Sequence, residues 1–183
     1  IERTSRGSQF MLHVGQQQQQ VDLQLLGQHN VANALATAAA ASALGLSLDQ
    51  IVQGLALARP YQGRLVSHQL SHNRYVIDDT YNANLGSVKA AIDVLQQCQG
   101  QRCFMLGDLG ELGQQELQLH QRIGTQVAAA GIEQFYAFGE LAAAAVDSYL
   151  RAGGNYGKIC VNKQELSSCF EQLPKVDLSC LVK

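Results

Sequence analysis

The sequence of 183 residues has few charged side chains, no basic cluster and no long apolar run. Charged residues make up 15% of the chain and the formal net charge is −2, which argues against a nucleic-acid partner. No apolar stretch approaches the roughly 18 residues that span a bilayer, so membrane insertion is not expected. The G-x-x-x-x-G-K-[ST] loop that cradles phosphates is also missing. Because 46% of the residues are hydrophobic, the chain can still build a globular core.

Cysteine is present but lacks the spacing of a metal or redox site. There is no C-x-x-C pair, and no histidine lies at metal-ligand spacing from a thiol. An odd number of scattered thiols is typical of a reducing cytoplasm, so we expect a cytoplasmic protein with buried free cysteines and no metal site. The five are Cys98, Cys103, Cys160, Cys169 and Cys180.

The first part of the chain reads as a hairpin followed by two helices. Residues 9–14 and 21–26 have strand-like patterns, and the glutamine tract at 16–20 is predicted to form the hairpin tip. Asn30 is the expected N-cap of a helix that ends at about Leu44. A second helix is expected from Ser47 to about Ala58.

The pattern changes near residue 79, after a second strand pair. A strand pair is expected at 64–70 and 74–78, and strands and helices then alternate, which predicts a doubly wound, Rossmann-like, mostly parallel α/β sheet. The expected helices are 87–97, 114–130, 141–151 and 164–173, and the expected strands are 102–106, 134–138, 158–161 and 178–182. We place a domain boundary near residue 80, which divides the chain into 1–80 and 81–183.

Polar side chains gather where expected strands meet expected helices. His29, Asn30 and Asn33 lie at a helix start, where a carboxamide fork suits an adenine edge. The alternative for Asn30 is a plain helix cap, but Asn33, one turn into an alanine-rich helix, is not explained by capping. Arg64 precedes a strand and suits a phosphate, although a lone arginine at a strand start is more often only solvated.

Two further loops follow expected strands, where ligands bind in such sheets. Residues 79–84 (DTYNAN) contain Asp79, a natural partner for ribose hydroxyls, followed by Tyr81, Asn82 and Asn84. Residues 107–113 (GDLGELG) contain Asp108 and Glu111, which suit an amine or a cation but equally favour a helix dipole. His120, in the helix that follows, is the one histidine with a suggestive position.

Three segments together resemble the Mur ligase family of ATP-dependent amide-forming enzymes: residues 27–34 (GQHNVANA), 79–84 and 107–113. The first is shared with folylpolyglutamate synthetase relatives. The other two are more typical of the family member that adds D-alanyl-D-alanine to UDP-N-acetylmuramoyl-tripeptide in peptidoglycan precursor synthesis. The resemblance covers essentially the whole chain. It implies that residues 1–80 are the tail of a central ATP-binding domain and that 81–183 are most of a C-terminal Rossmann-like domain.

The resemblance also implies roles for the polar residues. Asn33, with His29 and Asn30, would face the adenine of ATP, while Arg64 would reach its phosphates or ribose and Asp79 the ribose hydroxyls. Tyr81, Asn82, Asn84, Asp108 and Glu111 would line the side of the cleft that receives the incoming dipeptide. The ligands of Mg²⁺ are expected outside this sequence. The chain starts at Ile1 and stops within a strand pattern, so we expect a piece of a longer enzyme. Because the phosphate loop is missing and the Mg²⁺ ligands are expected elsewhere, we expect this piece to be inactive alone. We also expect a monomer.

Two other interpretations stay open. The chain could belong to a sister ligase that adds a single amino acid, such as diaminopimelate or lysine, or to a polyglutamate synthetase. It could also be a nucleotide-binding module without catalytic activity, which the missing phosphate loop would favour.

Overall fold

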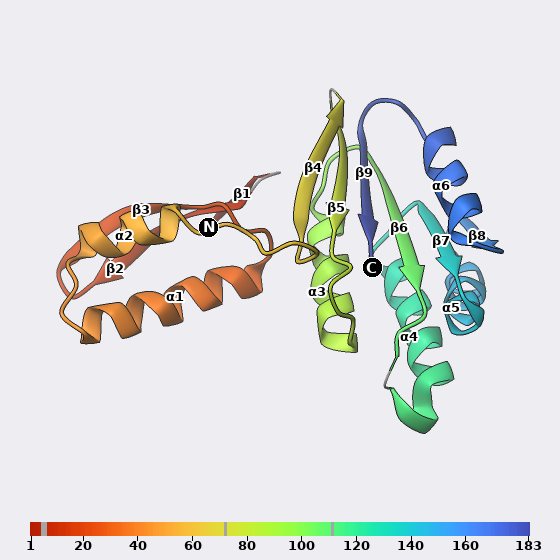
Figure 1. The fold of residues 1–183 in the computed structure, drawn as a ribbon, viewed down its shortest axis with the longest axis horizontal. Helices are drawn as coiled ribbons and strands as arrows, with labels where there is room; N and C mark the ends of the chain where they lie inside the picture. Colours follow the sequence, from red (N-terminus) through yellow and green to blue (C-terminus); the bar gives the residue numbers. More distant parts are fainter. Residues whose placement is uncertain (5–6, 72, 111) are drawn as a thin grey trace. The chain divides into compact units, whose positions relative to one another are not determined.

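The computed structural model describes residues 1–4, 7–71, 73–110 and 112–183, which form two compact units, Ile1–Tyr61 and Gln62–Lys183 (Figure 1). The division therefore falls at a different place from the expected boundary near residue 80. The reason is a long-range pairing. Strand β5 (Arg74–Asp78) runs parallel to β9 (Leu178–Val182), about a hundred residues later, so it belongs to the second unit.

The first unit is a three-stranded antiparallel sheet packed against two helices. The strands β1 (Glu2–Thr4), β2 (Gly7–Val14) and β3 (Gln17–Leu23) lie in that order. Helices α1 (Gln28–Ala43) and α2 (Leu48–Ala56) bury their apolar side chains against one face of this sheet. Helix α2 begins with the expected cap, because the Ser47 side chain accepts a hydrogen bond from the Gln50 amide.

The glutamine tract is not the tip of the hairpin, so that prediction is wrong. Val14 pairs with Gln17, and the turn consists of Gly15 and Gln16 alone. Gly15 has a φ of 60°, a conformation that glycine adopts at little steric cost and that allows a two-residue turn. The remaining glutamines therefore continue β3, an edge strand.

The second unit is a six-stranded sheet in the order β4-β5-β9-β6-β7-β8. Strand β4 (Val66–Ser71) is antiparallel to β5, and every other neighbouring pair is parallel, which confirms the predicted α/β fold class. The other strands are β6 (Gln101–Gly107), β7 (Gln134–Phe138) and β8 (Tyr156–Cys160). The helices are α3 (Leu85–Gln96), the short η1 (Gly113–Gln115), α4 (Glu116–Ala129), α5 (Glu140–Arg151) and α6 (Lys163–Gln172).

Helices cover both faces of this sheet. Successive side chains along a strand point to opposite faces of the sheet, so Cys103 and Phe104 lie on different faces. Phe104 stacks on Phe135, and Phe135 meets Tyr149 of α5 edge-on, both with ring centroids 5.5 Å apart. On the other face, Cys103 belongs to a core cluster with Cys169 of α6. As predicted, the thiols are free and Cys103, Cys160 and Cys180 are buried.

A charged pair ties β6 to the segment before β7. The Arg102 guanidinium lies 2.6 Å from a Glu133 carboxylate oxygen, and the Arg102 amide donates to the other oxygen at 2.9 Å. Partial burial raises the pKa of the Glu133 carboxyl, but the hydrogen bonds from Arg102 outweigh burial and leave this pKa below its usual value. Glu133 therefore stabilises the fold when it is ionised.

We expect Glu133→Gln to lower the free energy of unfolding by about 1 kcal/mol at pH 7. A depressed carboxyl pKa gives stability that is present above the unfolded value of about 4.3 and is lost as the pH falls through the folded value. The difference between the variant and the parent should therefore vanish in acid. Thermal unfolding between pH 7 and pH 2.5 measures this. Asp93→Asn, in the exposed Lys89–Asp93 pair, is the control and should change little; a constant deficit for Glu133→Gln at every pH would contradict the assignment.

Candidate functional site

The candidate site of the second unit lies at the carboxyl ends of the parallel strands. Residues 79–84 follow β5, residues 107–110 follow β6, and Lys183 follows β9. Residues 62–65 come before β4, the antiparallel neighbour of β5, and so lie at the same edge. We call residues 62–65 and 79–84 the paired loops, because they contact each other directly.

Asp79 is the residue that joins the paired loops. One carboxylate oxygen accepts a hydrogen bond from the Leu65 amide at 3.1 Å, and the other forms an ion pair with Lys183. The Asp79 amide also donates to the Val182 carbonyl at 3.0 Å. Asp79 is only 8% exposed. Its predicted contact with a ribose would thus have to use the carboxylate lone pairs that these partners leave.

Arg64 and Tyr81 form the exposed part of the paired loops. The guanidinium carbon lies 4.5 Å from the centre of the Tyr81 ring, a cation–π distance. The Tyr81 amide donates to the Gly63 carbonyl at 3.0 Å. A Cβ at Gly63 would lie 2.9 Å from the Tyr81 nitrogen, so the close approach requires glycine. The structure thus brings Arg64 and Tyr81 together, and the guanidinium is on an exposed residue that a ligand can reach.

The two asparagines of this segment have different environments. The Asn82 carbonyl accepts a hydrogen bond from the Lys183 ammonium at 3.1 Å. The Asn84 side chain accepts from the Ser87 amide at 2.9 Å and caps α3, while the Ser87 hydroxyl accepts from the Asn84 amide at 3.0 Å. This capping box accounts for Asn84 without a ligand. Its predicted contact with the dipeptide stays a prediction.

The Asp108 side chain is hydrogen-bonded to helix α5. Its carboxylate accepts a hydrogen bond from the Ala142 amide at 2.7 Å, in the first turn of α5. A Cβ at Gly139, whose φ is 119°, would lie 2.3 Å from this carboxylate. The acid thus lies at a helix N-terminus, but at that of α5 and not of the helix that follows its own loop. Its predicted contact with the dipeptide stays a prediction. Glu111 lies outside the described residues.

His120 of α4 is hydrogen-bonded to the 107–110 loop. It is fully buried, and its Nε2 accepts a hydrogen bond from the Leu109 amide at 3.1 Å. Because Nε2 is an acceptor, the ring proton sits on Nδ1, which donates to the Glu116 carbonyl at 2.8 Å. The neutral ring is thus satisfied on both sides, and it orders a loop rather than facing a substrate.

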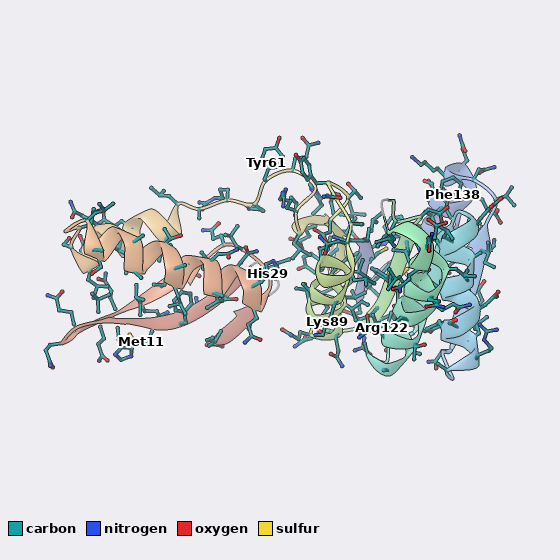
Figure 2. All side chains as sticks on the ribbon, turned by 90° about the horizontal axis from the view of Figure 1, so that it is seen from below. Met11, His29, Tyr61, Lys89, Arg122 and Phe138 are labelled. Carbon is teal, nitrogen blue, oxygen red and sulfur yellow. The ribbon has the colours of Figure 1, made fainter. Side chains whose placement is uncertain are left out.

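The first unit carries the other predicted residues at the start of α1, where Figure 2 labels His29. Asn30 is not the N-cap, so that prediction is wrong: the helix begins one turn earlier, after Gly27, whose φ is 92°. The Asn30 side chain instead donates to the Leu26 carbonyl at 2.7 Å. Asn33 donates to the Asn30 side-chain oxygen at 3.4 Å, so the two share one face as predicted, and Asn33 is exposed.

Neither a metal site nor a membrane-spanning helix occurs in the described part of the chain. No group of three or more His, Cys, Asp or Glu side chains among those residues is arranged to hold a metal ion. The resemblance places the ligands of Mg²⁺ outside this sequence, and no chemical step is assigned to the ion in this chain. None of the described helices has the length and apolar character needed to cross a bilayer.

Comparison with known proteins decides the family. Residues 63–179 match the profile described as Mur ligase, glutamate ligase domain. The chain belongs to the Mur ligase family. The matched region begins within two residues of the second unit, which supports the division of the structure at Tyr61 rather than near residue 80.

Individual relatives of this Mur ligase chain carry more specific names. The chain is 41% identical over 140 residues to the UDP-N-acetylmuramoyl-tripeptide–D-alanyl-D-alanine ligase of Escherichia coli, covering 76% of this chain and 31% of that protein. A crystal structure of MurF from Acinetobacter baumannii is 35% identical, with a TM-score of 0.86 over the whole of this chain and 40% of that one. MurF from Thermotoga maritima, solved with ADP, is 18% identical over 90% of this chain and 37% of that one; its TM-score of 0.72 shows the shared fold.

Sequence reasoning missed one residue of the site. Lys183 follows an apolar strand and looked like the end of a pattern, whereas its side chain, 1% exposed, contacts Asp79 and Asn82 of the paired loops. The only available signal was register: β9 runs parallel to β5, with Val182 opposite Asp78. A lysine after β9 is thus level with Asp79 after β5, but this is visible only once the two strands are known to be neighbours.

Proposed function

We propose that this chain is the C-terminal part of an ATP-dependent ligase that joins D-alanyl-D-alanine to UDP-N-acetylmuramoyl-tripeptide. The observation that carries the proposal is the pair of interlocked loops at the carboxyl ends of the strands, in a chain whose relatives bear that ligase name. The chain spans 31% to 40% of the length of the E. coli and A. baumannii relatives, so the remaining parts of the reaction belong to regions outside it.

The proposal assigns the two units to different domains of the ligase. In this proposal Ile1–Tyr61 is the tail of a central ATP-binding domain, and Gln62–Lys183 is the C-terminal Rossmann-like domain. We further propose a monomeric enzyme of the cytoplasm, where the five free thiols would stay reduced.

On the nucleotide side, Asn33 with His29 and Asn30 would face the adenine of ATP. Exposure of Asn33 and its bond to Asn30 support a shared recognition face, since a carboxamide offers both a donor and an acceptor. Arg64 would meet the phosphates, and Asp79 the ribose hydroxyls.

On the acceptor side, Tyr81, Asn82 and Asn84 would border the place where the dipeptide enters. Asp108 and Glu111 would lie on the same side, with the Asp108 carboxylate already holding the first turn of α5. The exposed Tyr81 ring, 58% accessible, supports a surface that a ligand can cover.

The proposed reaction has two steps. Transfer of the terminal phosphoryl group of ATP to the carboxylate of the tripeptide gives an acyl phosphate and ADP. The free amine of the dipeptide then attacks this carbonyl, and collapse of the tetrahedral intermediate expels inorganic phosphate and leaves the new amide bond. Positive charge near the phosphates, to which Arg64 would contribute, stabilises the negative charge that develops in such steps.

Phosphate release by the full-length protein tests the proposal. We expect release with ATP, Mg²⁺ and the UDP-linked tripeptide only when D-alanyl-D-alanine is added, and none from the 183-residue chain alone. Release with a single amino acid in place of the dipeptide would assign the protein to a sister ligase. No release with any acceptor would leave a nucleotide-binding module, and turnover by the isolated chain would contradict the assignment of the chemistry to outside regions.

A further inference from the structure

Lys183 places a buried positive charge against residues 79–84 of the paired loops. Its side chain is 1% exposed, forms an ion pair with Asp79 and donates to the Asn82 carbonyl at 3.1 Å. An ammonium group is strongly destabilised away from water unless it is paired and hydrogen-bonded. Asp79 and Asn82, both in the 79–84 loop, therefore compensate this charge. Asp79 also accepts a hydrogen bond from the Leu65 amide, which links it to the 62–65 loop.

The sheet holds the Lys183 backbone independently of these loops. Its amide donates to the Met105 carbonyl at 2.9 Å, and its carbonyl accepts from the Gly107 amide at 2.9 Å. Both bonds continue the pairing of β9 with β6. The side chain thus extends from a fixed strand end, and removing its charge would leave these backbone bonds in place.

The loop on the far side of Asp79 has a conformation that needs support. Leu65 has a φ of 54°, in the left-handed region that is unfavourable for a branched, bulky residue, and it is 5% exposed. Two hydrogen bonds hold this turn. The Leu65 amide donates to the Asp79 carboxylate, and the Tyr81 amide donates to the Gly63 carbonyl. Arg64 lies between Gly63 and Leu65, so the same bonds fix the backbone from which its side chain extends, and its guanidinium lies over the Tyr81 ring.

We infer that Lys183 is a positioning residue for the ligation reaction. This inference rests on the proposed function and deepens it. The ammonium fixes the Asp79 carboxylate and the Asn82 carbonyl, and through Asp79 it fixes the turn that carries Arg64. One charge on a rigid strand end therefore aligns the proposed phosphate-binding residue and the proposed dipeptide-binding segment with each other.

Amide hydrogen exchange and turnover of the full-length protein test this together. In Lys183→Met we expect faster exchange of the Leu65 and Tyr81 amides, while the Ile77 and Phe104 amides within β5 and β6 stay protected. Turnover with saturating ATP and dipeptide should fall about 100-fold, the usual effect of misplacing reacting groups by about 1 Å. Lys183→Arg, which keeps the charge, should restore much of the protection and part of the turnover.

A matched control separates charge from position. Lys89→Met removes an ammonium from the exposed Lys89–Asp93 pair of α3 and should change neither exchange nor turnover. Unchanged exchange of Leu65 and Tyr81 in Lys183→Met would overturn the inference, and so would faster exchange with full turnover. If the parent shows no turnover with any acceptor, the proposed function fails, and with it the claim that Lys183 serves ligation; exchange then reports only whether Lys183 orders the loops.

Discussion

Replacing Phe135 by alanine is expected to lower the free energy of unfolding of the second unit by about 3–5 kcal/mol. Phe135 of β7 is fully buried, stacked on Phe104 and met edge-on by Tyr149. Truncation removes the apolar area of one ring and the aromatic contacts of two others. Backbone hydrogen bonds join β7 to β6 on one side and to β8 on the other, so the cavity cannot close by a simple shift.

Phe138→Ala is the matched control, since Phe138 is the last residue of the same strand and is only partly buried. We expect it to lose less than half as much stability. Denaturant titration followed by circular dichroism measures both, with the transition of the second unit analysed separately because the chain has two units. Equal losses at the two positions would show that Phe135 is not the centre of the core.

Local pattern predicted most of the second unit because each element buries its own apolar face. Strand β7 and its neighbour β6 match the expected ranges within a residue, and the strict alternation of strands and helices fixed the parallel class. The strand pair before residue 80 was misassigned because its partner is distant in the sequence. It was placed in the first domain, whereas its neighbour β9 comes about a hundred residues later.

The candidate site shows the same limit. Arg64 and Tyr81 were chosen for their chemistry, and the structure brings them into contact. Asn84 and Asp108 were chosen on the same grounds, yet Asn84 caps α3, a use that short polar residues at helix starts also suit. The Asp108 carboxylate accepts from the Ala142 amide in the first turn of α5, a distant helix. Lys183 was missed because a lysine after a strand has no distinctive local signal. Residue type thus indicated where a site could form, whereas strand order decided which side chains meet.

Gly124→Ala is the second substitution with a large expected effect, about 3 kcal/mol of lost stability, at the upper end for overpacking. A Cβ on Gly124 of α4 would lie 1.9 Å from the Ala145 carbonyl oxygen and 2.9 Å from the Tyr149 nitrogen, both in the backbone of α5. Backbone atoms of a helix cannot turn aside as a flexible side chain can. The two helices would have to separate along their whole contact.

Gly54→Ala provides the opposite case on a helix. A Cβ at Gly54 of α2 meets nothing within 4 Å, so alanine should stabilise the first unit by about 0.5–1 kcal/mol through its helix propensity. Denaturant titration of both variants tests whether Gly124→Ala lowers the free energy of unfolding and Gly54→Ala raises it. A Gly124→Ala protein as stable as the parent would contradict the close approach of α4 and α5.

The effect of Gly124→Ala should also reach the 107–110 loop, because that loop is attached to both helices. His120 of α4 accepts from the Leu109 amide, and Asp108 accepts from the Ala142 amide of α5. Moving α4 away from α5 stretches the loop between two anchors, so we expect faster exchange of the Leu109 amide. The paired loops are anchored instead through Lys183 and β9, so their Leu65 amide should keep its protection. Loss of protection at both amides would show that the two parts of the site respond as one.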